Sequence, residues 1–234
     1  MSYTKRNDGR KFDEPRKMEA KIGVIPRADG SAMFKIGDTI AIAAVYGPRE
    51  LHPKFLQNPE KGILRCNYDM TSFSVPERKK PGPSRRGTEI SLVIEKSLLP
   101  VLDLNQFPNA VVDVFIEIIQ ANAGTRCAGI TAASMALAHA GVPMRNLVSA
   151  VSVGKVGDKI VIDLDKSEED YEEGATDIPV AMNGDHEITL LQLDGEISKD
   201  ELLKALELAR KGCAEIDKVQ RDTLKEFYRG IKDE

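Results

Sequence analysis

The first third of the chain alternates apolar and polar positions between turn sequences, a pattern typical of antiparallel strands. Turns at residues 28–30 and 37–38 separate the first three runs, which together predict a β-meander. The next run places Cys66, Tyr68 and Met70 at alternate positions, as expected for a strand with one buried face. The four predicted strands are residues 18–26, 31–36, 39–46 and 63–73.

Three segments repeat apolar or small residues at helical spacing. One begins after Ser84 and should stop near Pro100, because proline cannot continue a helix. Small residues dominate 124–140, which predicts a helix that lies close against a sheet. The third starts with the capping-box sequence 198–201 and is placed at 198–230. Further strands are predicted at residues 111–121, 148–156, 159–164, 178–182 and 188–193.

This order of strands and helices predicts an α+β fold. The 234 residues suit one large domain or two small ones, and they suffice for an aliphatic core without disulfides or a structural metal. Cys66, Cys127 and Cys213 form no CxxC pair, which favours a reducing compartment and disfavours a zinc site. The chain shows neither a signal-peptide core nor an apolar run of the ~20 residues that span a membrane. We therefore expect a cytoplasmic protein with no membrane partner.

A cationic segment stands out in a chain of net charge -4. Residues 78–86 contain five cations and no acid, and Arg85 and Arg86 fall in the first turn of a predicted helix. Cation-rich loops are most often solvated surface. Here Pro81 and Pro83 stiffen the approach, and arginine forks suit phosphate oxygens. The segment therefore predicts binding of a phosphate-bearing polyanion.

Gly124-Thr125-Arg126 follows a predicted strand and opens a predicted helix. Free backbone amides, a hydroxyl and a guanidinium at one helix start are what a phosphate ion needs. A purely structural helix cap is the alternative.

Acidic residues crowd the stretch from 165 to 177, and most should be solvated loop charges. Asp177 differs because it immediately precedes the predicted strand 178–182 and should be fixed by the sheet. Asp177 with Asp170 as second carboxylate could hold a hard divalent cation, and Asp177 could instead donate a proton to a leaving oxygen. The acidic residues are Asp165, Glu168, Glu169, Asp170, Glu172, Glu173 and Asp177.

Other chemistries lack their motifs. The three histidines stand alone, Ser134 has no GxSxG context, and neither a Walker P-loop nor GxGxxG occurs. Hydrolase triads, nucleotide triphosphatases and dehydrogenases are therefore unsupported.

Five motifs resemble those of the RNase PH-type phosphorolytic exoribonucleases, and most closely those of the catalytic subunit type of the archaeal exosome. They are YGPRE at 46–50, ERKKPGPSRR at 77–86, DVFIE at 113–117, AGTR at 123–126 and DIPVA at 177–181. The resemblance runs from about Asp8 to the last helix. It implies the RNase PH fold, which is like domain 2 of ribosomal protein S5, with mixed β-sheets packed with α-helices.

The resemblance also implies an organisation for the chain. Residues 1–234 would form a single RNase PH-like domain, with conserved halves at about 16–142 and 145–210. Such a subunit would alternate with a catalytically silent paralogue in a hexameric ring, bind RNA-binding cap proteins, and degrade single-stranded RNA from its 3′ end. Inorganic phosphate would be the co-substrate and nucleoside diphosphates the products. In reverse, the reaction would add 3′ tails.

The same resemblance assigns roles to the site residues. Asp177 would be the essential carboxylate and, with Asp170, would hold Mg²⁺ or Mn²⁺. Arg85 and Arg86 would hold the last phosphates of the RNA. The attacking phosphate would be held by Gly124, Thr125 and Arg126. The loop that narrows the ring channel would contain Arg49, His52 and Lys54. Without the resemblance, that last segment would be an ordinary basic turn.

Two departures from the family pattern bear on the metal. The interval from Asp170 to Asp177 is one residue longer than in relatives, and Pro179 stands where polynucleotide phosphorylases place a lysine. Two competing functions also remain open. One is a homohexameric RNase PH that trims transfer RNA 3′ ends, and the other is a non-catalytic scaffold subunit that threads RNA. Retention of Arg85, Arg86, Arg126 and Asp177 argues against the scaffold.

Overall fold

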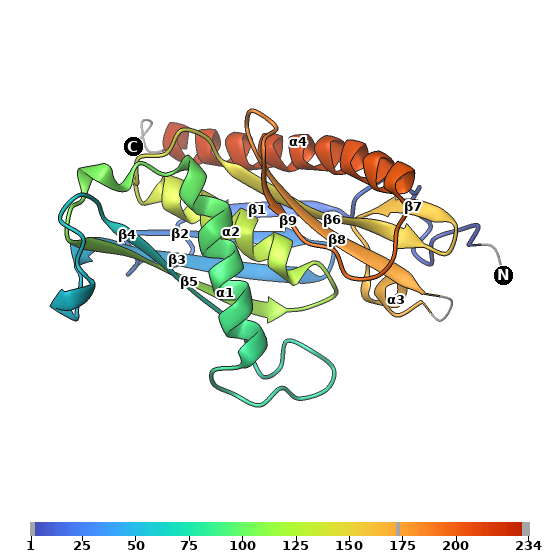
Figure 1. The fold of residues 1–234 in the computed structure, drawn as a ribbon, viewed down its shortest axis with the longest axis horizontal. Coiled ribbons are helices and arrows are strands. Elements are labelled where there is room, and N and C mark those ends of the chain that lie inside the picture. The colour runs from blue at the N-terminus through green and yellow to red at the C-terminus, as the bar shows by residue number, and fades with distance from the viewer. Residues whose placement is uncertain (1–2, 172–173, 231–234) are drawn as a thin grey trace.

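The computed structural model describes residues 3–171 and 174–230. A five-stranded sheet comes first, in the order β1-β2-β3-β5-β4 (Figure 1). All its pairs are antiparallel except that of β4 with β5, which is parallel. The sheet is therefore mixed, and it starts with the predicted meander. Its strands are β1 Met18–Ile22, β2 Gly30–Ile36, β3 Thr39–Glu50, β4 Ile63–Met70 and β5 Ala110–Gln120.

The second sheet is antiparallel throughout and has the order β7-β6-β8-β9. Its strand β6 is nearly all buried and pairs along its full length with β8. This pairing fixes the backbone of the segment that carries Asp177. The strands are β6 Val148–Val156, β7 Lys159–Ile162, β8 Ala175–Asn183 and β9 Ile188–Leu191.

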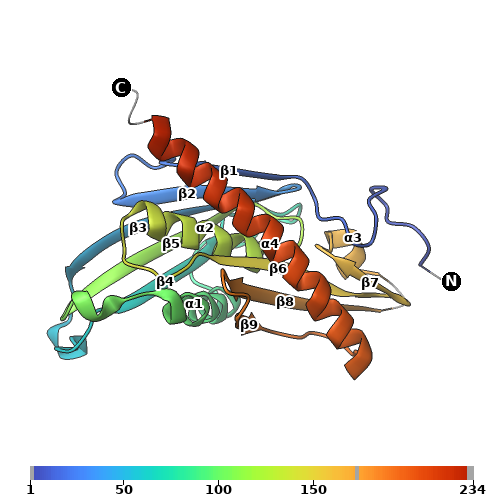
Figure 2. The same cartoon turned by 90° about the horizontal axis from the view of Figure 1, so that it is seen from above.

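Helix α2 (Thr125–His139) contacts β2 and β3 of the first sheet and β6 of the second. Its small residues permit this close approach, since a Cβ at Gly129 would lie 3.2 Å from the Ile116 side chain. Helix α1 (Arg85–Leu98) packs on β4, and α4 (Lys199–Gly230) runs across β6, β7 and β1 (Figure 2). The short helical segments are α3 Lys166–Glu169 and the 3-10 helices η1 Lys54–Leu56, η2 Leu99–Val101 and η3 Leu104–Gln106.

Several boundaries differ from the prediction. The first strand ends at Ile22, because Gly23 adopts a left-handed φ of 74° and turns the chain. Asp177 lies inside β8 instead of before it, because pairing with β6 already starts at Ala175. Part of the acidic loop is helical: Asp165 and Glu168 form a capping box that opens α3. Glu172 and Glu173 lie outside the described residues.

The aliphatic core lies between the two sheets and around α2, as the composition predicts. Cys66, Cys127 and Cys213 are buried free thiols. Within the part of the chain that the structure describes, no helix combines the length and apolar character that crossing a membrane requires.

Candidate active site

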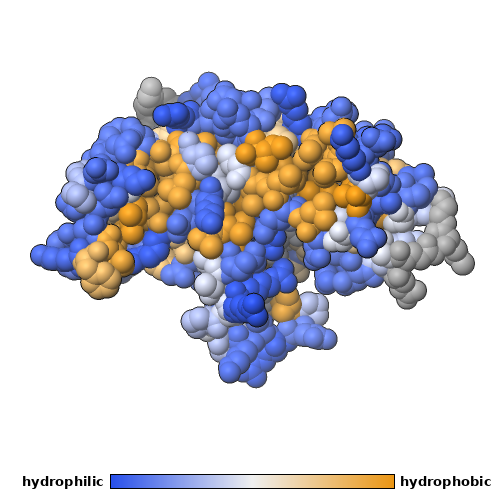
Figure 3. Space-filling model, in the orientation of Figure 1, coloured by the Kyte–Doolittle hydropathy of each residue, from blue (hydrophilic) through white to orange (hydrophobic). Residues whose placement is uncertain are grey.

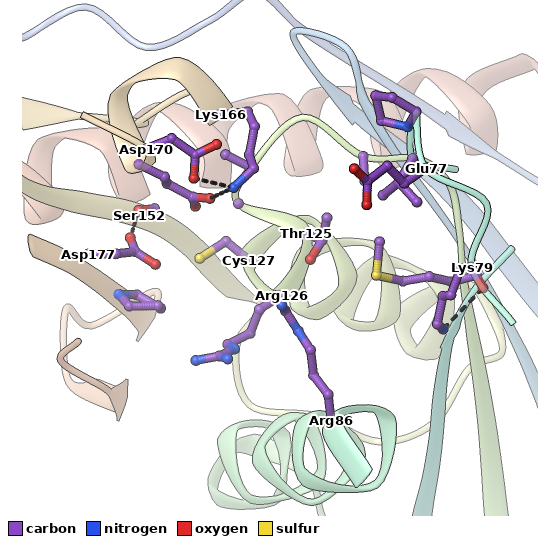
Figure 4. Close-up of a pocket in the computed structure, with 18 of the residues that line it drawn as sticks. Glu77, Lys79, Arg86, Thr125, Arg126, Cys127, Ser152, Lys166, Asp170 and Asp177 are labelled. Atoms are coloured by element: carbon purple, nitrogen blue, oxygen red, sulfur yellow. Dashed lines mark hydrogen bonds and ion pairs between the residues drawn. The ribbon is translucent and has the colours of Figure 1, made fainter. Parts of the chain in front are cut away.

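A cavity of about 680 Å³ opens where the first turns of α1 and α2 face β8 and α3. Figure 4 shows Arg86 and Arg126 reaching into it from two helices, with Asp177 on the opposite wall. A second cavity of about 600 Å³ adjoins it, shares these three residues and extends toward Gln192. Three elements far apart in sequence thus place cations and a carboxylate around one space.

Asp177 is held rigidly by the second sheet. Its backbone exchanges two 2.9 Å hydrogen bonds with Asp194 on one side, and β8 pairs with β6 on the other. The Ser152 hydroxyl donates a hydrogen bond to Oδ1 of Asp177. Burial raises the pKa of Asp177 above its usual value, although Ser152 and Arg126 oppose this rise.

Glu169 on α3 and Asp194 both interact electrostatically with Asp177. Burial and the charge of Asp177 raise the pKa of Glu169 to about 7, while Lys166, Arg86 and a hydrogen bond from the Gly124 backbone amide lower it. Asp170 also lines the cavity. Its side chain is 61% exposed and forms a 2.6 Å ion pair with Lys166.

The start of α2 has the features of an anion site. Gly124 caps the helix with a left-handed backbone and no side-chain cap, and its own amide bonds to Glu169. The amides that follow Gly124 in the first turn of α2 are therefore the donors that a phosphate could use. The Tyr68 hydroxyl donates a 2.9 Å hydrogen bond to Oγ1 of Thr125. This bond fixes the Thr125 side chain at the helix start, where its hydroxyl lines the cavity.

Arg126 is held in place by two residues from other elements. Its Nη1 donates to Oε1 of Gln192, and its Nη2 lies 3.8 Å from Oε2 of Glu89. The Gln192 amide in turn donates a 3.1 Å hydrogen bond to Glu89. The Nε of Arg126 is buried without a protein hydrogen-bond partner among the described residues, so the guanidinium keeps donor capacity toward the cavity.

The two arginines in the first turn of α1 differ in their relation to the cavities. Ser84 caps this helix by accepting a 2.9 Å hydrogen bond from the Gly87 amide, so Arg85 and Arg86 occupy the first turn, as predicted. Both are exposed, but Arg86 lines both cavities, whereas Arg85 is not part of either lining within the described residues.

The three cations of the predicted channel loop lie away from this site. Figure 1 shows the connection after β3, which carries η1, at the end of the molecule opposite α3. Arg49 lies 3.5 Å from Asp29 and stacks on Tyr46, and His52 and Lys54 lie within 3.8 Å of Glu50. All three side chains are more than half exposed.

The carboxylates present fit a magnesium ion that keeps most of its waters. Mg²⁺ in phosphate chemistry is commonly held by one or two carboxylates together with substrate oxygens. Asp177 and Asp170 line the same cavity, and one oxygen of Asp177 is free of Ser152. No cluster of three or more candidate metal-ligating residues occurs within residues 3–171 and 174–230.

Four residues of the site were not assigned from the sequence: Tyr68, Glu89, Ser152 and Gln192. Glu169 was also not separated from the other acidic residues of its stretch. Glu89 sits one turn after Arg85 and Arg86, so helical spacing alone could have placed it near them. Ser152 and Gln192 carry no comparable signal, because strand pairing across the second sheet brings them to the site.

Comparison with known proteins identifies the family to which this chain belongs. Residues 14–143 match domain 1 of the 3′ exoribonuclease family, and residues 146–212 match domain 2. The chain belongs to this family. Among curated family members, "Exosome complex component Rrp41" of Thermococcus kodakarensis is 54% identical over 98% of this chain and 92% of its own length. The protein of the same name from Methanopyrus kandleri is 49% identical over 96% of this chain and 94% of its own length.

Two solved structures support the fold. Rice Rrp46 superposes with a TM-score of 0.82 at 24% identity, covering 94% of this chain and all of that one. The Archaeoglobus fulgidus exosome with RNA bound to the active site gives a TM-score of 0.80 at 24% identity, covering 92% of each chain. The prediction of an RNase PH fold is therefore confirmed.

Proposed function

We propose that this chain is a catalytic subunit of an exosome ring and degrades single-stranded RNA from the 3′ end by phosphorolysis. The observation that carries the proposal is the meeting of Arg86, Arg126, the α2 cap and Asp177 in one cavity. A scaffold subunit has no use for this arrangement. The similarity to Rrp41 components over 98% of the chain supports the same assignment.

The central physical problem of phosphorolysis is to bring two anions together. Phosphate on the Gly124-Thr125 cap and Arg126 would sit beside the terminal phosphodiester held by Arg86. Guanidinium groups and helix-start amides lower the repulsion and stabilise charge that develops in the transition state. An oxygen of inorganic phosphate then attacks the terminal phosphorus, and the bond from phosphorus to the O3′ of the preceding nucleotide breaks. A nucleoside diphosphate leaves.

The leaving O3′ needs a proton, and Asp177 is the group placed to give it. Its raised pKa lets the carboxyl hold a proton at a higher pH than an exposed aspartate does. In the alternative role, an ionised Asp177 would with Asp170 hold Mg²⁺ or Mn²⁺, which would neutralise charge on phosphate oxygens. Lys166 would have to release Asp170 for this. In reverse, the same site would add nucleotides from diphosphates.

Assembly into a ring is supported by an exposed apolar face. Leu92 on α1 and Leu99 at the start of η2 are exposed together with Ile188 and Leu191 of β9, and α1 contacts β9. Figure 3 shows apolar surface across the middle of this face of the molecule. Patches of this kind mark protein contacts. In this proposal the chain alternates with a catalytically silent paralogue, binds RNA-binding cap proteins and lies in the cytoplasm. The ring channel contacts RNA through Arg49, His52 and Lys54.

The test is the product released from single-stranded RNA by this chain with its copurifying ring partner and Mg²⁺. We expect nucleoside diphosphates that appear only when inorganic phosphate is present. Monophosphates would mean hydrolysis and would overturn the mechanism, and no product would favour the scaffold. Equal activity of the chain alone, as a hexamer, would instead favour a homohexameric RNase PH acting on transfer RNA.

A further inference from the structure

Arg16 is a buried arginine on the N-terminal segment just before β1. It is 7% exposed. Its Nε and Nη2 bind both carboxylate oxygens of Asp163 at 2.8 and 2.7 Å, and its backbone amide donates a further 2.8 Å bond to Asp163. This fork is the strongest geometry available to an arginine and a carboxylate. It joins the N-terminal segment to Asp163, two residues before the acidic stretch.

The third guanidinium nitrogen of Arg16 reaches the phosphate loop. Nη1 donates a hydrogen bond to the backbone oxygen of Asn122. The next two residues, Ala123 and Gly124, both have left-handed φ angles of 60° and 63°, a conformation that alanine rarely adopts without tertiary support. Arg16 therefore holds the residue immediately before the strained turn that presents the α2 cap.

Asp163 continues the connection to the catalytic carboxylate. It is itself left-handed, with φ 52°, and is 2% exposed. Its backbone amide donates a 2.6 Å hydrogen bond to the backbone oxygen of Ser152, whose hydroxyl binds Asp177. The Arg16 guanidinium thus bonds on one side to the loop before Gly124. On the other side it is connected to Asp177 through Asp163 and Ser152.

We propose that Arg16 is a positioning residue that sets the phosphate-binding loop and Asp177 in their mutual geometry. The inference rests on the proposed function, since it concerns the same site. Only arginine suits the role, because it alone offers a planar fork to Asp163 and a further donor to Asn122. Gly37 supports this placement: a Cβ there would collide with the Arg16 Cδ.

The test compares Arg16→Lys and Arg16→Gln with two controls in the assembled ring. Arg10→Lys perturbs the other arginine on Asp163, whose guanidinium bonds to Asp8, Glu14 and Asp163. Ile216→Val, on the buried face of α4 and outside both cavity linings, lowers stability without touching the network. Lysine can satisfy Asp163 or Asn122 but not both, so Arg16→Lys keeps the test valid even where Arg16→Gln fails to fold.

We expect Arg16→Lys to raise KM for phosphate and to lower kcat, each about tenfold, since a misplacement of about 1 Å can cost a factor on the order of 100. KM for RNA should stay within about twofold, because Arg86 stands on α1, outside this network. A merely structural role would lower the unfolding temperature and leave these constants intact, as expected for Ile216→Val. Unchanged KM for phosphate and unchanged kcat in Arg16→Lys would overturn the inference.

A second readout does not depend on activity. Amide hydrogen exchange at residues 122–126 should be faster in Arg16→Lys than in either control. Unchanged exchange there would also overturn the inference. A wild-type ring that releases no diphosphate would refute the proposed function alone, and the exchange data would still decide the role of Arg16.

Discussion

The Ser152 hydroxyl donates a hydrogen bond to the Asp177 carboxylate across the paired strands β6 and β8. Ser152 is 2% exposed, so the bond is made in a water-poor environment where it strongly favours the ionised carboxylate. Ser152 thus partly offsets the effect of burial, which raises the pKa of Asp177. A neighbour on another strand therefore tunes the protonation of the proposed catalytic carboxyl against the larger effect of burial.

Ser152→Ala should therefore raise the pKa of Asp177 further. If Asp177 acts as the acid, the alkaline limb of the kcat profile should move to higher pH relative to wild type, because the carboxyl keeps its proton longer. The measurement is the ratio of variant to wild-type kcat across pH, which cancels the titration of phosphate itself. Movement of the acidic limb instead would mean that the ionised form is required, as for a metal ligand.

Asp177→Asn should lower turnover by about 10²–10⁴-fold, the usual worth of a positioned acid or base. RNA affinity and ring assembly should be nearly unchanged, because the amide preserves shape and strand pairing. Diphosphate release, RNA binding and size-exclusion chromatography provide the three readouts. Wild-type rates in this variant would remove Asp177 from the mechanism.

Arg86→Glu should weaken RNA binding and reduce the salt slope of log K by about one. The structure separates the predicted pair, since both are exposed but only Arg86 of the two lines the cavities. We expect a smaller effect from Arg85→Glu. Lys96→Glu, exposed near the other end of α1, serves as the charge-matched control. Equal losses in all three variants would indicate diffuse attraction instead of a defined contact.

The difference between Arg85 and Arg86 marks the limit of what the sequence could predict. Helix caps and strand alternation are local features, so Ser84, Gly124 and the strand 148–156 are predictable from the sequence. The capping box of Asp165 and Glu168 at α3 is also a local pattern, but the many surrounding acidic residues favoured the interpretation as a loop. Which arginine faces the cavity depends on how α1 packs on β4. The contacts from Ser152 to Asp177 and from Arg16 to Asn122 join residues 25 and 106 positions apart, and only the assembled sheets create them.

Glu89→Gln should tighten phosphate binding. The Glu89 carboxylate lies 3.8 Å from Arg126 and is about half exposed, so it competes weakly with phosphate for that guanidinium. Exposed ion pairs contribute about 0.2–1 kcal/mol, and KM for phosphate should fall by a factor between about 1.4 and 5. Steady-state kinetics at saturating RNA measure this change. A rise in KM would mean that Glu89 orients Arg126 more than it competes for it.

Glu169 should make the folded protein less stable as pH rises. Its pKa is about 7 in the folded state, against about 4.3 in an unfolded chain, so the folded state binds the proton more tightly. The stabilisation is fully present below the unfolded pKa and is lost as pH climbs through 7, a change on the order of 3 kcal/mol. Urea unfolding of wild type and Glu169→Gln at pH 5 and pH 8, with EDTA present, tests this. The variant should lose less stability than wild type between the two pH values, because the glutamine amide does not ionise, and identical losses would contradict the assigned environment of Glu169.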